Sequence, residues 1–191
     1  MALFDKYDYL IAGLGNPGAK YAATRHNVGW MAADRIAEKY EVNFSRSARG
    51  FLKAKIKIED KVILLIKPTT FMNLSGEPIA YLAKKHKIAP SQVIAITDEY
   101  NFPVGKMKLK KGGSSGGHNG IQSIIDELGR PDFWRLRLGI DKNFDFGGMV
   151  DYVLSEFAPR EMDDLGDMLT RAAESIKLIV EMTPDRAMGL I

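Results

Sequence analysis

Several polar side chains stand next to apolar stretches of the sequence, where strands end and helices begin. Asn16 follows the first apolar stretch, His26 precedes an amphipathic one, and Asp98 ends a later apolar stretch. Histidine is the side chain best suited to accept a proton near neutral pH, and a carboxylate can orient its ring. Asn73 and Asn119 add neutral hydrogen-bonding groups. This combination suits attack on an ester or amide with no large charge at the reacting carbon.

Two opposing influences act on His26. Its place just before a helix N-terminus disfavours the imidazolium form, whereas a nearby Asp98 favours it, and the sequence leaves open which prevails. Because there is no cysteine and no suitable serine arrangement, attack by an activated water is the simplest mechanism. We expect the Asn73 amide or a backbone N–H to stabilise the oxyanion. Structural roles stay open as well, since Asn27, Asn73 or Asn119 can cap a helix and His26 can be a structural histidine.

The stretch LIAGLGNPGAKY carries glycines in the G-x-G-x-x-G spacing of a dinucleotide-binding turn, at Gly13, Gly15 and Gly18. That site requires a helix to open at the third glycine. Here Pro17 pushes Asn16 away from helical angles, and no apolar stripe follows directly. We therefore expect a tight turn that carries Asn16 to a strand end, where it acts together with His26.

Two further motifs also fail on context. The stretch GGSSGG fits G-x-S-x-G, but a nucleophile elbow requires an acid and then a histidine later in the chain, and only His118 follows, with no acid between. The histidines, His26, His86 and His118, form no pair with metal-ligand spacing. We expect neither a metal nor a cofactor.

Composition sets broad limits on the protein. The chain has 191 residues, a hydrophobic fraction of 46%, a charged fraction of 27% and a formal net charge of +3, which fit one globular domain. The absence of cysteine excludes disulfides, Cys-ligated zinc, Fe–S clusters and a thiol nucleophile. No signal peptide or membrane span is recognisable. We expect a cytoplasmic monomer without a membrane partner.

Hydrophobic patterning predicts a mixed α/β fold. The expected strands cover residues 7–12, 51–58, 62–67, 91–98, 105–111 and 133–140, and the expected helices cover residues 28–40, 76–87, 121–129 and 159–182. Two neighbouring strands separated by only a short turn predict an antiparallel hairpin, and strand–helix alternation elsewhere predicts parallel pairs. The fold class is α/β, with a twisted mixed sheet and helices on both faces. We expect a single domain over residues 1–191, a mobile connector over about 142–151 and a C-terminal helix over about 159–182.

Several blocks of the sequence together resemble the bacterial-type peptidyl-tRNA hydrolases. The blocks are GLGNPGAKYAATRHNVG, PTTFMNLSG, TDEYNFP, GGSSGGHNGIQSII and FWRLRLGI. The resemblance implies hydrolysis of the ester between a peptide and the 3′-terminal ribose of tRNA, which recycles tRNA from prematurely released peptidyl-tRNA. It implies His26 as the base, Asp98 as the carboxylate that orients it, and Asn16 as a residue that distinguishes blocked from free aminoacyl-tRNA.

The same resemblance implies how tRNA and peptide are bound. Contacts to the acceptor end or the peptide are implied for Tyr21, Phe71, Asn73 and Asn119. Met72 and His118 are implied to line the same substrate-binding cleft. Contacts to the terminal phosphate are implied for Lys108, Lys110 and Arg137. Some residues depart from the family pattern, because Thr97 replaces a frequent histidine and Asn101 a frequent acid. The alternative is a non-catalytic RNA-binding relative of the splicing-factor type, but such a protein has no need of an oriented base.

Overall fold

The computed structural model describes residues 6–191 and contains one seven-stranded sheet in the order β2-β3-β4-β1-β5-β7-β6. The strands are β1 (Tyr9–Gly13), β2 (Ser45–Ser47), β3 (Phe51–Ile58), β4 (Lys61–Pro68), β5 (Val93–Glu99), β6 (Met107–Lys111) and β7 (Trp134–Gly139). The helices are α1 (Val28–Lys39), α2 (Gly76–His86), α3 (Asn119–Leu128), α4 (Met149–Val153), α5 (Met162–Met182) and α6 (Pro184–Ala187). The predicted α/β class and the mixed sheet are confirmed.

The sheet has a parallel centre and antiparallel edges. Strands β4, β1, β5 and β7 run parallel, while β2 and β3 at one edge and β6 at the other pair antiparallel with their neighbours. The predicted hairpin forms between β3 and β4, with Phe51 opposite Pro68 and Ile58 opposite Lys61. The carboxyl ends of all four parallel strands therefore meet at one edge of the sheet, where α/β proteins bind their ligands.

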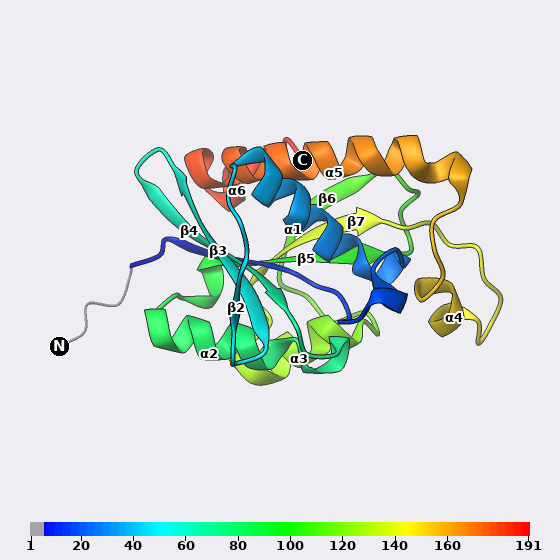
Figure 1. Ribbon diagram of the computed structural model, residues 1–191, viewed down its shortest axis with the longest axis horizontal. Helices are drawn as coiled ribbons and strands as arrows, with labels where there is room; N and C mark the ends of the chain where they lie inside the picture. The colour runs from blue at the N-terminus through cyan, green and yellow to red at the C-terminus, as the bar shows by residue number, and fades with distance from the viewer. Residues whose placement is uncertain (1–5) are drawn as a thin grey trace.

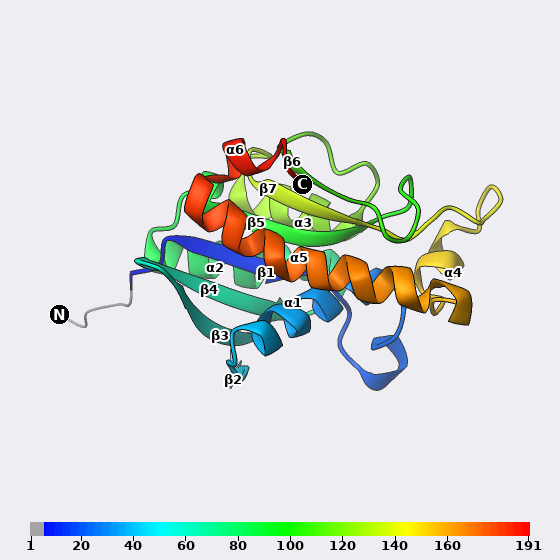
Figure 2. The same cartoon turned by 90° about the horizontal axis from the view of Figure 1, so that it is seen from above.

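Helices cover both faces of the sheet, as predicted (Figures 1 and 2). Helices α1 and α5 lie on one face, and α2 and α3 lie on the other. Side chains of β1 alternate between the two cores, since Ile11 packs with the α1 and α5 side while Leu10 and Ala12 pack with the α2 and α3 side. No helix in residues 6–191 combines the length and apolarity needed to cross a bilayer.

Two glycines allow α1 to begin in direct contact with the end of β1. A Cβ on Gly13 would lie 2.3 Å from the carbonyl oxygen of Gly29, and a Cβ on Gly29 would lie 2.4 Å from the carbonyl oxygen of Ile96. Within the glycine motif only Gly18 has a positive φ, at 108°. The expected turn therefore explains Gly18, whereas Gly13 is required by the close approach of strand and helix.

The C-terminal third differs in detail from the expectation. The predicted helix over residues 159–182 begins as a 3₁₀ turn, Pro159–Glu161, and becomes α-helical only at Met162. The expected connector over residues 142–151 includes the start of α4, Met149–Val153. Such a short helix, like strand β2 and helix α6, carries too few residues for a clear hydrophobic period.

Candidate active site

A cavity of about 530 Å³ lies at the carboxyl ends of the parallel strands. This volume is typical of small-molecule sites. The predicted site residues that line it are Asn16, His26, Phe71, Met72, Asn73, Asp98, Lys110, His118, Asn119 and Arg137. Tyr21 and Lys108 are not among its lining residues. Tyr21 lies in a separate 3₁₀ turn beneath the ammonium of Lys20, and Lys108 is exposed on the outermost strand, β6.

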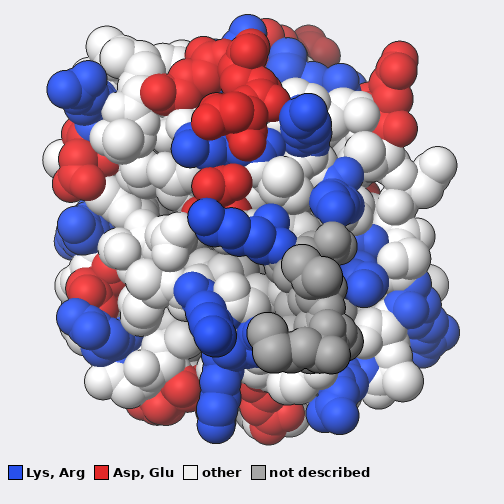
Figure 3. All heavy atoms as spheres, turned by 90° about the vertical axis from the view of Figure 1, so that its left-hand side faces the viewer, with Lys and Arg blue, Asp and Glu red and all other residues white. Residues whose placement is uncertain are grey.

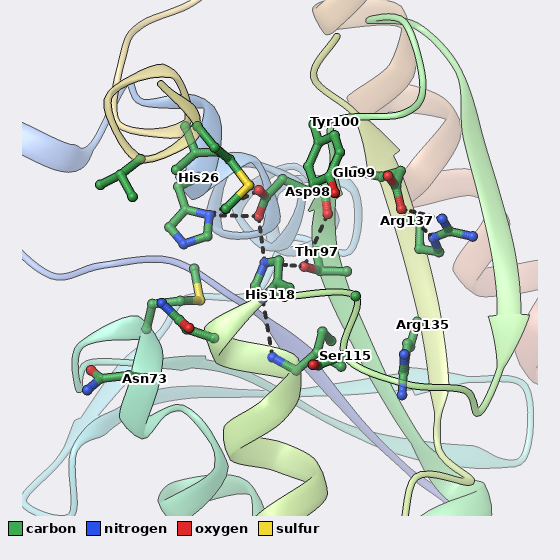
Figure 4. A pocket seen from close by; sticks show the side chains of 18 of the residues that line it. His26, Asn73, Thr97, Asp98, Glu99, Tyr100, Ser115, His118, Arg135 and Arg137 are labelled. Carbon is green, nitrogen blue, oxygen red and sulfur yellow. Dashed lines mark hydrogen bonds and ion pairs between the residues drawn. The ribbon is translucent and has the colours of Figure 1, made fainter. Parts of the chain in front are cut away.

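His26 and Asp98 form a hydrogen-bonded pair (Figure 4). The His26 Nδ1 atom lies 3.0 Å from each carboxylate oxygen of Asp98. Because a carboxylate only accepts hydrogen bonds, Nδ1 carries the hydrogen and donates it, which leaves a lone pair on Nε2. Nε2 makes no hydrogen bond within residues 6–191, and the His26 ring lines the cavity. This geometry gives a histidine that can accept a proton from a molecule in the cavity.

Asp98 prevails over burial in setting the pKa of His26. Burial of the ring lowers the pKa, but the charge and the hydrogen bond of Asp98 raise it, and the result is a pKa above the ordinary value. Burial also raises the pKa of Asp98, yet His26 and His118 hold that pKa well below its usual range. Asp98 is therefore ionised at neutral pH.

His118 contacts the same carboxylate as His26 does. Its Nε2 atom lies 2.9 Å from Asp98 Oδ1 and 2.7 Å from Thr97 Oγ1. Its Nδ1 atom accepts hydrogen bonds from the backbone N–H groups of Gly120 and Ile121, so His118 is the N-cap of α3. This residue was expected only as part of the cleft lining. Neither the cap nor the contact with Thr97 was expected.

Asn16 is held by Asn27 and Met72. The Asn16 N–H donates to Asn27 Oδ1 at 2.9 Å, and Asn27 Nδ2 returns a bond of 3.0 Å to the Asn16 carbonyl. The Met72 N–H donates to Asn16 Oδ1 at 2.8 Å. Asn16 and His26, which were expected to act together, both line the cavity, and the Asn16 side chain is held by the backbone of Met72. Asn27 makes no side-chain cap for α1, so that alternative is wrong.

The amide of Asn16 has a fixed orientation. Since Oδ1 accepts from the backbone, the Nδ2 donors remain for a ligand. Asn73 lies in the 3₁₀ turn Met72–Leu74, is exposed, and makes no side-chain hydrogen bond within residues 6–191. Asn119, in the first turn of α3, is likewise exposed. The cavity therefore presents free amides around the histidine.

Cationic groups form one wall of the cavity. Lys110 on β6 lies opposite Arg135 on β7, and Arg137 forms an ion pair with Glu99. Arg135 donates 2.6 Å hydrogen bonds to the carbonyl oxygens of Ser114 and Gly113, which fixes the glycine-rich loop. Burial, together with Arg137, lowers the pKa of Arg135 to about 10, so it stays charged.

Basic groups also occur far from this wall. At the end of the molecule opposite α4, Lys and Arg side chains are interspersed with Asp and Glu (Figure 3). On β3, Lys53, Lys55 and Lys57 are exposed, while the apolar residues between them are mostly buried, as expected for a solvated face. Positive charge alone therefore does not locate the site.

Arg25 links the histidine segment to the C-terminal part of the chain. Its guanidinium donates to both carboxylate oxygens of Glu161, at 3.0 and 2.7 Å, and to the Ile140 carbonyl at 2.9 Å. It also lies over the rings of Tyr152 and Phe157. No role was predicted for Arg25, although its position directly beside the candidate base, His26, was an available signal.

His26, Asp98 and His118 are also the one group in residues 6–191 whose donor atoms converge as metal ligands would, within 4.8 Å of one another. The N–O separations of 2.9 and 3.0 Å are those of direct hydrogen bonds. A metal would have to replace both ring hydrogens that donate to Asp98. The hydrogen-bonded arrangement accounts for these three residues without a metal.

Comparison with known proteins identifies the family. A family model described as peptidyl-tRNA hydrolase matches residues 10–191. The chain is 43% identical over 183 residues to the peptidyl-tRNA hydrolase of Thermodesulfovibrio yellowstonii, covering 95% of this chain and 97% of the relative. It is 42% identical over 181 residues to that of Desulfitobacterium hafniense, with the same coverage of 95% and 97%.

A solved structure gives the same answer. The crystal structure of peptidyl-tRNA hydrolase from Acinetobacter baumannii superposes with a TM-score of 0.90 at 32% sequence identity, covering 97% of this chain and 96% of that one. The fold, the oriented histidine and the sequence similarity agree. The chain belongs to the peptidyl-tRNA hydrolase family.

Proposed function

We propose that this cavity binds the acceptor end of peptidyl-tRNA and hydrolyses the ester between peptide and tRNA, with His26 as the general base. One observation carries the assignment of the base. Both carboxylate oxygens of Asp98 accept from His26 Nδ1. The other ring nitrogen, Nε2, is therefore the one available to a molecule in the cavity that His26 lines. A protein that only bound RNA would have no use for a proton acceptor held in this way.

The reaction needs no group beyond water and these side chains. His26 Nε2 accepts a proton from a water molecule as the water oxygen attacks the ester carbonyl carbon. The tetrahedral oxyanion is stabilised by a donor such as the unpaired Asn73 amide. When the intermediate collapses, the C–O bond to the ribose breaks and the ribose oxygen takes the proton from His26. The products are the free peptide acid and tRNA.

Substrate contacts follow the two sides of the cavity. The amide donors of Asn16 and Asn119, together with Phe71 and Met72, face the blocked aminoacyl end. Lys110 and Arg137 supply charge for the terminal phosphate of tRNA. Contacts from Tyr21 and Lys108 require that the tRNA extend beyond the cavity.

We further propose a setting for this activity. The chain acts as a single domain and a monomer in the cytoplasm, where it recycles tRNA from prematurely released peptidyl-tRNA. The connector expected over about 142–151, of which residues 142–148 precede α4, is mobile. Helix α4 carries apolar side chains, among them Val150 and Val153, to the cavity wall. An apolar wall of this kind suits the variable side chains of a peptide.

Deacylation of N-acetyl-aminoacyl-tRNA, compared with unblocked aminoacyl-tRNA, tests the proposal. We expect release from the blocked substrate and a loss of at least about 100-fold in His26→Ala, since a general base contributes at least that much. His86→Ala is the matched control, because His86 lies at the end of α2 and is not part of the cavity. Equal activity in His26→Ala would remove His26 from the mechanism, and no release by the wild type would favour the non-catalytic RNA binder. Full turnover by Asn73→Asp would exclude Asn73 as the oxyanion donor.

A further inference from the structure

We infer that His118 is a positioning residue, which connects the N-terminus of α3 to Asp98 and so fixes the carboxylate that orients His26. The inference rests on the proposed role of His26 as the base. It assigns different tasks to the two histidines that share Asp98 (Figure 4).

The hydrogen bonds determine the tautomer of His118. The backbone N–H groups of Gly120 and Ile121 lie 3.1 and 3.2 Å from Nδ1. An N–H can only donate, so Nδ1 carries a lone pair and Nε2 carries the ring hydrogen. Nε2 lies 2.9 Å from Asp98 Oδ1 and 2.7 Å from Thr97 Oγ1, so both oxygens are possible acceptors for its hydrogen. The ring is thus fixed at both nitrogens.

This tautomer prevents His118 from acting as the base. Its lone pair faces the first turn of α3, and its hydrogen faces Asp98 and Thr97. The ring of His26 lies 5.0 Å away, centroid to centroid, and has the open nitrogen. The two histidines therefore have different roles because their hydrogen-bond partners differ.

Thr97 weakens the hydrogen bond that His118 Nε2 donates to Asp98, because it offers a second acceptor. It is buried, with 3% of its surface exposed, and its hydroxyl competes with Asp98 for the same Nε2 hydrogen. The titratable side chains that act on Asp98 are those of His26, before α1, and His118, at the start of α3. A donor from His118 draws charge from the carboxylate, so it weakens the support that Asp98 gives to the imidazolium form of His26.

Two variants separate capping from positioning. His118→Asn keeps a side-chain oxygen that can cap α3, but its shorter side chain cannot also reach Asp98. His118→Ala removes both contacts. We expect the alanine variant to lose about 2–4 °C in Tm and the asparagine variant to recover most of that loss. In both variants, we expect the fall of kcat/KM on the acid side of its pH profile (the acid limb) to move to higher pH by roughly half to one unit. The reason is that Asp98 no longer accepts a hydrogen bond from His118, so it raises the pKa of His26 further.

We expect Thr97→Val to shift the acid limb of kcat/KM in the opposite direction from the His118 variants. Without the hydroxyl, the Nε2 hydrogen of His118 is donated to Asp98 alone, so the acid limb moves to lower pH. His86→Ala, remote from the cavity, leaves the limb in place. If the limb stayed fixed in both His118 variants and only KM rose, His118 would be a substrate contact and the inference would be wrong.

The tautomer can be measured without substrate. In ¹H–¹⁵N spectra of the labelled full chain, His118 Nδ1 should have the chemical shift of an unprotonated nitrogen and Nε2 that of a protonated one. A proton on Nδ1 would overturn the inference whatever the activity. If instead His26→Ala kept full activity, the proposed base would fail while this spectrum stayed as expected, so the two failures are distinguishable.

Discussion

Replacement of Arg25 by methionine tests whether this buried cation holds the C-terminal segment against the active site. The guanidinium side chain is 7% exposed and that of its partner, Glu161, is 13% exposed. Methionine has a similar apolar stem, so the variant removes the charge and five interactions: two hydrogen bonds to Glu161, one to Ile140, and the cation–π contacts with the rings of Tyr152 and Phe157.

The expected loss is about 3 kcal/mol of unfolding free energy. Breaking a buried ion pair by removal of one partner costs about 3–5 kcal/mol, and the partial exposure of Glu161 places this pair at the lower end. For a chain of this size, 1 kcal/mol corresponds to about 2–4 °C in Tm, so Tm should fall by about 6–12 °C. The exposed pair of Arg35 and Glu38 provides the control, since Arg35→Met should cost less than about 1 kcal/mol.

Urea denaturation and thermal unfolding monitored by circular dichroism measure both variants. Hydrogen bonds from Arg25 lower the pKa of Glu161 in the folded state, despite its burial. The stabilisation is therefore present above the unfolded pKa of about 4.5 and is lost as the pH falls through the folded pKa. The difference between wild type and Arg25→Met should shrink below about pH 4.5. A loss under 1 kcal/mol at pH 7, or a difference that grows in acid, would refute the reasoning.

Three further outcomes are expected. Gly29→Ala should lower Tm by several degrees or prevent folding, because its Cβ would lie 2.4 Å from a backbone oxygen of β5. Asp98→Asn should move the acid limb of kcat/KM down by about 1–3 pH units while the maximal rate falls, because the carboxylate raises the pKa of His26; an unchanged limb would contradict this. Lys110→Gln should raise KM and reduce the salt dependence of log KM by about one unit of slope, whereas Lys57→Gln, on an exposed strand face, should not.

Local patterns in the sequence predicted most of the fold. Strand β3 alternates lysine with apolar residues and forms over residues 51–58 as expected. Helix α3 ends at Gly129, whose φ of 70° places it in the left-handed region that favours glycine at this position. Both patterns depend on residues close together in the sequence, so they can be recognised in a single sequence. The sequence also indicated that Asn16, His26 and Asp98 lie near one another, because the carboxyl ends of parallel strands share one edge of the sheet.

Contacts between distant segments could not be read in the same way. Arg25 reaches residues more than one hundred positions away, and the cap of α3 by His118 depends on a ring orientation that Asp98 and Thr97 fix from β5. Asn27 occupied a capping position, yet its amide bonds to the backbone of Asn16 instead. Residue type and spacing do not encode which of several possible partners a polar side chain will meet.

The central place of β1 has a consequence for how the chain folds. Residues 9–13 come first along the chain, yet they pair with β4 on one side and with β5 on the other, at residues 63–66 and 93–96. On the ribosome, one edge of this strand stays unpaired until residues 63–66 have emerged, and the other until residues 93–96 have emerged. Pairings at such separations fold slowly, so the β3–β4 hairpin, whose strands adjoin in sequence, is expected to form first and to provide the template on which β1 docks.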